Sequence, residues 1–121
     1  YPYLIMKGVG VWGEMVESEK LGLFLPLRDI RGKIHSAQTI DSEGGKKFLS
    51  GGRVQGCFYA VNRHLGSPIV ICEGYATGAT IAEATGWTVI SAMNCGNLLA
   101  VAQEESDTGI ILFLFKYFFI R

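Results

Sequence analysis

One carboxylate in this sequence, that of Glu73, stands where ligand chemistry is expected. Glu73 follows the apolar run Ile69–Cys72 and precedes Gly74. Such a run predicts a buried strand, so Glu73 would lie at its carboxyl end, where open α/β sheets bind ligands. There it could act as a general acid or base, or bind a metal ion. It could equally cap the helix that follows, because a helix N-terminus favours negative charge.

Four polar or small residues near Glu73 are further candidates for a binding site. Gly74 has no side chain, which leaves room for a substrate beside the carboxylate. Thr77 could hold the loop of Glu73, although support of the helix start is the stronger interpretation. Asn94 and Asn97 follow the next apolar run, where they could hydrogen-bond a nucleotide or a phosphate at a helix N-terminus. For Asn97, turn formation and helix capping are favoured.

Basic residues concentrate in one half of the chain. Residues 28–64 carry seven basic and three acidic groups, a net of +4, whereas residues 65–121 carry two basic and five acidic groups, a net of −3. Lys46, Lys47 and Arg53 flank a Gly-rich turn, where they could contact phosphates or belong to a solvated loop. A basic half joined to an acidic half suits a nucleic-acid enzyme with a metal site, and ordinary surface charge is the equal alternative.

Apolar periodicity indicates which elements position these residues. In the first half, apolar runs separated by Gly-containing turns predict strands, at 21–27, 34–40 and 57–61. Pro26 predicts a sheet edge or a bulge at the end of the first strand. In the second half, continuous apolar runs alternate with helical segments, giving strands at 68–72, 88–92 and 109–115 and helices at 75–84 and 98–105. Gly86 stands where a helix C-cap is expected. The order β-α-β-α-β predicts a parallel sheet with right-handed crossovers.

The composition limits the classes of protein that need to be considered. A chain of 121 residues with 49% hydrophobic residues and a net charge of zero is a domain or part of one, not a disordered or generic polyanion-binding chain. Its three cysteines lack C-x-x-C spacing, which indicates reduced thiols in the cytoplasm instead of a zinc site or a disulfide framework. The apolar tail 110–121 is shorter than the ~20 residues of a membrane span, so no membrane partner is expected. A first residue other than Met suggests a fragment.

Two segments of the second half resemble the Toprim domain of phage- and plasmid-type DNA primases. They are Cys72-Glu-Gly-Tyr-Ala-Thr-Gly78 and Val89-Ile-Ser-Ala-Met-Asn-Cys-Gly-Asn-Leu98. The first half is similar to the basic β subdomain that precedes Toprim in primase catalytic cores. The residues that carry this similarity are Pro2-Tyr-Leu4 with Lys7, Pro26-Leu-Arg-Asp29, Gly32-Lys33, Gln38, Lys47-Phe-Leu49 and Gly51-Gly-Arg53. The resemblance covers about residues 1–105.

The resemblance implies template-directed synthesis of RNA primers in plasmid or phage DNA replication. Single-stranded DNA and ribonucleotides would be the partners, with a helicase segment or protein as a further one. Two magnesium ions would align the reacting groups and stabilise the transition state. Glu73 would be the motif acid and a metal ligand, and Lys47 and Arg53 would lie toward nucleotide or template. The implied fold is α/β, with a small antiparallel β-rich part in residues 1–64 and an incomplete Toprim domain in residues 65–121.

The sequence departs from the Toprim pattern after its third predicted strand. Toprim domains carry an Asp-x-Asp pair there, whereas no acidic residue follows Asp107 and Lys116 stands close to the expected position. One carboxylate cannot hold two divalent ions against water. We therefore expect a primase-type nucleotidyltransferase core that binds Mg²⁺ poorly and is inactive as this chain, from a truncated or frame-shifted gene. The alternatives are a non-catalytic nucleic-acid-binding remnant and a Toprim nuclease or topoisomerase fragment, which lacks a well-placed nucleophilic Tyr.

Overall fold

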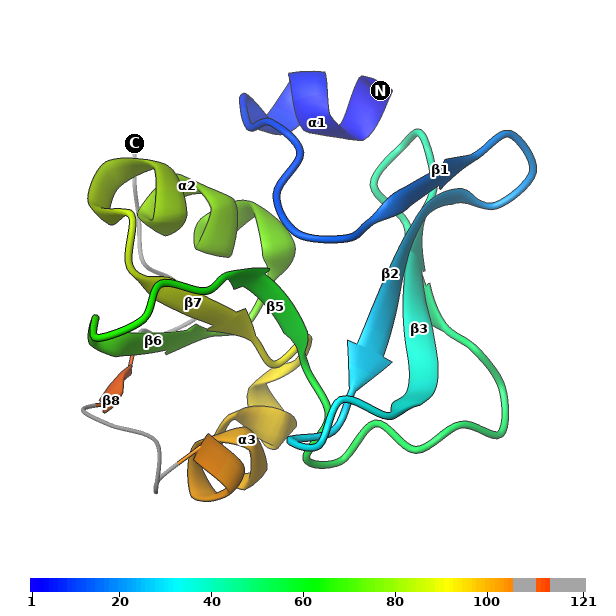
Figure 1. The fold of residues 1–121 in the computed structure, drawn as a ribbon. Coiled ribbons are helices and arrows are strands. Elements are labelled where there is room, and N and C mark those ends of the chain that lie inside the picture. Colours follow the sequence, from blue (N-terminus) through cyan, green and yellow to red (C-terminus); the bar gives the residue numbers. More distant parts are fainter. Residues whose placement is uncertain (106–110, 114–121) are drawn as a thin grey trace.

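The computed structural model describes residues 1–105 and 111–113, which form two β-sheets and several helices (Figure 1). The helices are α1 (Pro2–Lys7), α2 (Tyr75–Thr85) and α3 (Leu98–Glu105), with the 3₁₀ helix η1 (Cys95–Asn97) before α3. The strands are β1 (Val16–Ser18), β2 (Gly22–Arg28), β3 (Ile34–Ile40), β4 (Lys46–Phe48), β5 (Tyr59–Asn62), β6 (Ile69–Cys72), β7 (Thr88–Ser91) and β8 (Ile111–Phe113).

The first sheet is an antiparallel meander in the order β1-β2-β3-β4. The predicted hairpin of β2 and β3 is confirmed, with a turn in which Gly32 has a φ of +92°. Pro26 lies past the residues of β2 that pair with β1, and the register of β2 shifts between Leu27 and Arg28, so the predicted bulge is confirmed. The strands β1 and β4 were not predicted, because β1 is short and follows a glycine-rich segment (Gly8, Gly10 and Gly13), and β4 lies in a polar segment.

The second sheet is mixed, with the order β5-β7-β6-β8. The strand β6 pairs in parallel with β7 and β8, but β5 pairs antiparallel with β7 and shifts register between Ala60 and Asn62. The predicted fold class, a small antiparallel part followed by an incomplete parallel Toprim sheet, is therefore wrong. The error comes from the placement of β5. Apolar residues predicted a strand there, but a local pattern does not determine which sheet a strand joins.

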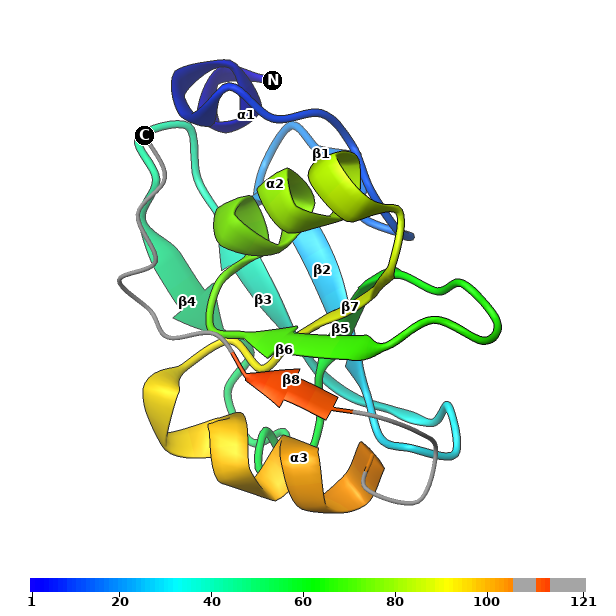
Figure 2. The same cartoon turned by 90° about the vertical axis from the view of Figure 1, so that its left-hand side faces the viewer.

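The helices α2 and α3 lie on opposite faces of the second sheet (Figures 1 and 2). On the α2 side, one apolar core continues into the first sheet and contains Leu25, Leu27 and Val61, and the smaller core under α3 contains Ile71 and Ile90. The close approach of α2 depends on a glycine. A Cβ atom on Gly78 would lie 3.0 Å from Val61 Cγ2 and 3.2 Å from Cys72 Sγ. The prediction that Gly86 ends α2 is confirmed by its left-handed φ of 70°.

Two buried tyrosines attach the segment after α1 to the rest of the chain. The Tyr75 hydroxyl donates to the carbonyl of Gly10 and accepts from the amide of Trp12, at 2.6 and 2.8 Å. The Tyr59 hydroxyl donates to the Trp12 carbonyl at 2.6 Å, and the two rings pack edge to face with centroids 5.9 Å apart. Burial raises the pKa of Tyr75 to about 12, so its hydroxyl stays protonated and can donate. These bonds place α1 above the start of α2 and the first sheet.

The predicted third strand of the second half, 109–115, falls only partly on described residues. Its central residues form β8, whereas Asp107 and Lys116 lie outside the described residues. Among the described helices, none has the length and apolar character that crossing a membrane requires.

Candidate functional site

Glu73 lies in a cleft of about 310 Å³ at the carboxyl end of β6. The cleft is lined by α1, β4, the turn after β6 with the first turn of α2, and the turn after β7. The lining residues are Tyr3, Lys7, Lys46, Glu73, Gly74, Ala76, Thr77 and Met93. The structure thus brings three of the predicted site residues together, Glu73, Gly74 and Thr77.

The backbone of Glu73 is held firmly by the neighbouring turn. Its carbonyl oxygen accepts hydrogen bonds from the Met93 amide at 2.7 Å and from Ser91 Oγ at 2.8 Å. Met93 has a φ of +78°, and among the described residues it is the single non-glycine with a positive φ. Such a conformation costs about 1–3 kcal/mol and is typical of functional sites. The fold therefore accepts local strain to fix the turn that carries Glu73.

The carboxylate of Glu73 does not cap the helix that follows it. The N-cap of α2 is Gly74, and within the described part no side chain forms a capping hydrogen bond there. Glu73 thus makes no capping hydrogen bond, although it immediately precedes the N-cap, where the helix dipole favours negative charge. Gly74 also leaves space beside the carboxylate: the nearest atom to a Cβ placed on it would be Lys46 Nζ, at 3.8 Å.

Two lysines give the cleft a positive charge. The Nζ atoms of Lys7 and Lys46 each lie 6.0 Å from the centroid of the Tyr3 ring. Burial lowers the pKa of Lys46, the charge of Lys7 lowers it further, and the Glu73 carboxylate opposes the shift. Two ammonium groups and one carboxylate thus share the described cleft, an arrangement that attracts anions.

The described residues of the cleft do not fit a site for two magnesium ions. Mg²⁺ prefers several oxygen ligands in octahedral geometry, and the described lining offers the carboxylate of Glu73 beside two ammonium groups. Nowhere in residues 1–105 or 111–113 do three or more His, Cys, Asp or Glu residues group as metal ligands. The expectation of poor Mg²⁺ binding by this chain stays a prediction.

Lys47 and Arg53 lie away from the cleft. Successive side chains of a strand point to opposite faces, so Lys47 faces away from the side to which β4 directs Lys46. Arg53 lines a different cavity of about 240 Å³ with α3 residues such as Glu104, and its Nε donates to the carbonyl of Gln55 at 2.9 Å. Both cations are exposed, and the structure does not bring them to Glu73.

Asn97 has a structural role in the protein interior. Its side chain is buried, and its Nδ2 donates to the carbonyls of Cys57 at 2.8 Å and Ala92 at 3.0 Å. Its Oδ1 accepts from the amide of Gly56 at 2.8 Å. Asn97 therefore joins the loop before β5 to the turn after β7, and does not cap α3 with its side chain. Asn94 is half-buried, begins η1 and is not among the residues that line the cleft.

Sequence reasoning missed three residues that line the cleft: Tyr3, Lys7 and Met93. Lys46 was considered together with Lys47 as a possible phosphate contact, and recognition of β4 would have separated the two by strand parity. Lys7 belonged to a segment of the family resemblance with no assigned role. Met93 gives no signal in the sequence, because a positive φ is unusual for its residue type.

Comparison with known proteins relates the chain to DNA primases. No protein-family model matches it. The chain is 40% identical over 107 residues to a protein named DNA primase TraC from Escherichia coli, and 38% identical over 107 residues to a second protein of that name and organism. The matches cover 84% of this chain but 10% and 7% of those proteins, so the chain spans a tenth or less of their length. By this similarity, the chain is a region related to DNA primases.

Proposed function

We propose that this chain is the nucleotide- and template-binding part of a DNA primase-type nucleotidyltransferase, which makes RNA primers on single-stranded DNA. The observation that carries the proposal is the cleft of Glu73, where a fixed turn presents a carboxylate beside two lysines. The segment 72–78, which resembles the Toprim motif of primases, forms this turn and the start of α2. The similarity to the TraC primases supports the same class of reaction.

In this proposal the described residues bind and orient the substrates. The carboxylate of Glu73 has no hydrogen bond to any described residue, so it is free to accept the proton of a primer 3′ hydroxyl. The lysines of the cleft would stabilise negative charge that develops on a phosphate. Lys47 and Arg53, exposed and outside the cleft, would contact the template backbone. We place this activity in the cytoplasm, with a helicase as a further partner of the complete primase.

The test uses the intact chain, a fluorescent single-stranded oligonucleotide and ATP. We expect the chain to bind both at low salt, and we expect the affinity for DNA to fall linearly with the logarithm of salt concentration. The double variant Lys47→Ala, Arg53→Ala should weaken DNA binding and flatten this dependence, whereas Lys20→Ala, in the β1–β2 turn, serves as the control. Failure to bind either ligand at low salt would overturn the proposal.

Primer synthesis is the second part of the test. With magnesium, single-stranded template and ribonucleotides, we expect this chain alone to give no product, because the described cleft offers one carboxylate. Robust primer synthesis by the chain would contradict that expectation and show that its residues hold the metal ions after all.

A non-catalytic DNA-binding remnant is the second candidate function. The observation that favours it is the separation of Lys47 and Arg53 from Glu73, since DNA could bind to those cations without use of the cleft. Binding of DNA without any binding of ATP would support this candidate. A topoisomerase-type enzyme with a tyrosine nucleophile is less well supported, because among the described tyrosines Tyr3, Tyr59 and Tyr75 are buried and Tyr1 is half-buried.

A further inference from the structure

We infer that Asn97 is a positioning residue for Glu73, because its side chain connects the strained turn behind Glu73 to the loop that carries Arg53. This inference deepens the proposed function and rests on it. In that proposal Arg53 contacts the template and Glu73 accepts a proton from the primer. Hydrogen bonds lead from one residue to the other, and the buried side-chain amide of Asn97 stands at their centre.

The first step is the loop of Arg53. The Arg53 Nε donates to the Gln55 carbonyl at 2.9 Å, so the guanidinium is attached to the loop itself. The same loop is held from below by Asn97, whose Oδ1 accepts from the Gly56 amide at 2.8 Å and whose Nδ2 donates to the Cys57 carbonyl at 2.8 Å. Asn97 is 4% exposed, so water does not compete for these bonds.

The second step is the peptide group that joins Ala92 and Met93. Its carbonyl accepts from Asn97 Nδ2 at 3.0 Å, and its amide donates to the Glu73 carbonyl at 2.7 Å. Because a peptide group is planar, its carbonyl and its amide turn together. One rigid unit therefore lies between Asn97 and Glu73, and a change at the first reaches the second.

The third step is the strain at Met93, which gives this unit a second arrangement. The φ of Met93 is +78°, in the left-handed region that residues with a side chain rarely adopt. Without the bond to Asn97, Met93 would relax toward negative φ, and the peptide group would turn away from the Glu73 carbonyl. Asn97 thus holds the strained arrangement in place.

The hydrogen bonds also explain why the residue is an asparagine. Three carbonyls, those of Val54, Cys57 and Ala92, lie within 3.2 Å of its Nδ2, and the amide of Gly56 donates to its Oδ1. A carboxylate of the same shape would place an oxygen against three acceptors. The side chain is therefore matched to the two loops that it joins.

The experiment uses NMR on the isotope-labelled intact chain with the single-stranded oligonucleotide of the binding test. In the wild type we expect bound DNA to shift the signals of the Met93 amide and the Glu73 carbonyl. In Asn97→Ala these shifts should be lost, while DNA affinity changes less than about twofold, because Lys47 and Arg53 still supply the phosphate contacts. Asn94→Ala, in the same turn, is the matched control and should keep the shifts.

Hydrogen exchange tests the connection without any ligand. Asn97→Ala should accelerate exchange of the Met93 amide more than exchange of the β2 amides, which report global unfolding. Asn97→Ser takes its place if Asn97→Ala does not fold. The strain itself is tested by urea unfolding, where Met93→Gly should be more stable than Met93→Ala. At most ordered positions the reverse holds, and only a positive φ favours glycine.

Three results would overturn the inference: DNA-induced shifts that persist in Asn97→Ala, shifts that are lost equally in Asn94→Ala, or a Met93→Ala variant more stable than Met93→Gly. If DNA binds the wild type and no shift reaches Met93, only this inference fails. If neither DNA nor ATP binds, the proposed function fails, and hydrogen exchange still decides whether Asn97 fixes the turn of Glu73.

Discussion

Two carboxylates of this molecule, those of Asp29 and Glu73, have opposite surroundings. Asp29 accepts hydrogen bonds from His35 Nε2 at 2.7 Å and from the amides of Arg31 and Lys33 at 2.9 and 3.0 Å. These bonds, that of His35 foremost, lower the pKa of Asp29 to about 2. Glu73 is fixed through its backbone carbonyl, and its side chain has no such bonds to described residues.

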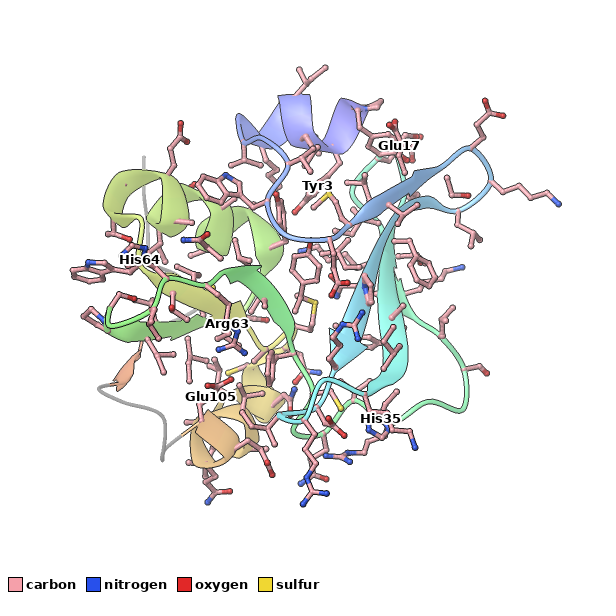
Figure 3. All side chains as sticks on the ribbon, viewed as in Figure 1. Tyr3, Glu17, His35, Arg63, His64 and Glu105 are labelled. Carbon is pink, nitrogen blue, oxygen red and sulfur yellow. The ribbon has the colours of Figure 1, made fainter. Side chains whose placement is uncertain are left out.

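The difference separates a structural carboxylate from one available to a ligand. Asp29 closes the turn between β2 and β3 and has its acceptors occupied. Glu73 has its position fixed by Met93 and Ser91 while its oxygens stay available. Figure 3 shows Tyr3, which lines the cleft of Glu73, and His35, the partner of Asp29, at opposite ends of the molecule. The hydrogen-bond partners of a polar side chain thus distinguish a structural group from one available to a ligand.

Asn97 belongs with Asp29 in this comparison, and its removal should have the largest effect. Asn97→Ala leaves the amide of Gly56 and the carbonyls of Cys57 and Ala92 without their partner in a buried place. Because an unpaired buried polar group costs about 1–3 kcal/mol, we expect the free energy of unfolding to fall by about 3 kcal/mol. Urea denaturation measures this loss through the midpoint of the transition.

Asn94→Ala is the matched control for Asn97→Ala. Asn94 is half-buried, and the described structure shows no hydrogen bond from its side chain, so we expect a change within about 0.5 kcal/mol. Equal losses of unfolding free energy in both variants would show that Asn97 is not a special structural residue, and it would again be a candidate ligand contact.

The Asp29–His35 pair should make stability depend on pH at the acid end. The folded-state pKa of Asp29 is about 2, below the ~3.9 of an unfolded Asp. Its stabilising contribution is therefore present above about pH 4 and is lost as the pH falls through about 2. Unfolding curves between pH 2 and 5 should show a steeper decline for the wild type than for Asp29→Asn. Parallel curves would mean that the bond to His35 contributes nothing to the fold.

Local pattern was enough to predict most elements of this fold, but not their pairing. The strand β3 matches its predicted bounds, and Gly86 ends α2 as expected, because alternation and a glycine C-cap are local signals. The pairing of β5 with β7 and the bonds of Asn97 to Gly56 and Cys57 depend on contacts across more than 25 residues. No local pattern contains such contacts.

The candidate site was likewise predicted only in part from the sequence. Glu73, Gly74 and Thr77 are neighbours in sequence, and the structure brings them together in one cleft. Lys7 and Lys46 reach that cleft from the other sheet and from α1, so their place could not be inferred from spacing. The short strand β4 decides that Lys46 faces the cleft and Lys47 does not, and its polar sequence concealed it.

Glu73→Gln should have the smallest effect on the fold and the most specific effect on the cleft. No described side chain loses a hydrogen bond, so we expect the free energy of unfolding to change by less than about 0.5 kcal/mol. Metal-free binding of pyrophosphate should become about threefold tighter, because the substitution removes the negative charge that faces the phosphates while both lysines stay. Calorimetry on the variant, beside Glu83→Gln on the exposed surface of α2 as the control, measures this change. Weaker binding of pyrophosphate by Glu73→Gln would show that the carboxylate orders the lysines instead of opposing the anion. A large loss of stability would place Glu73 with Asp29 among the residues that the fold requires.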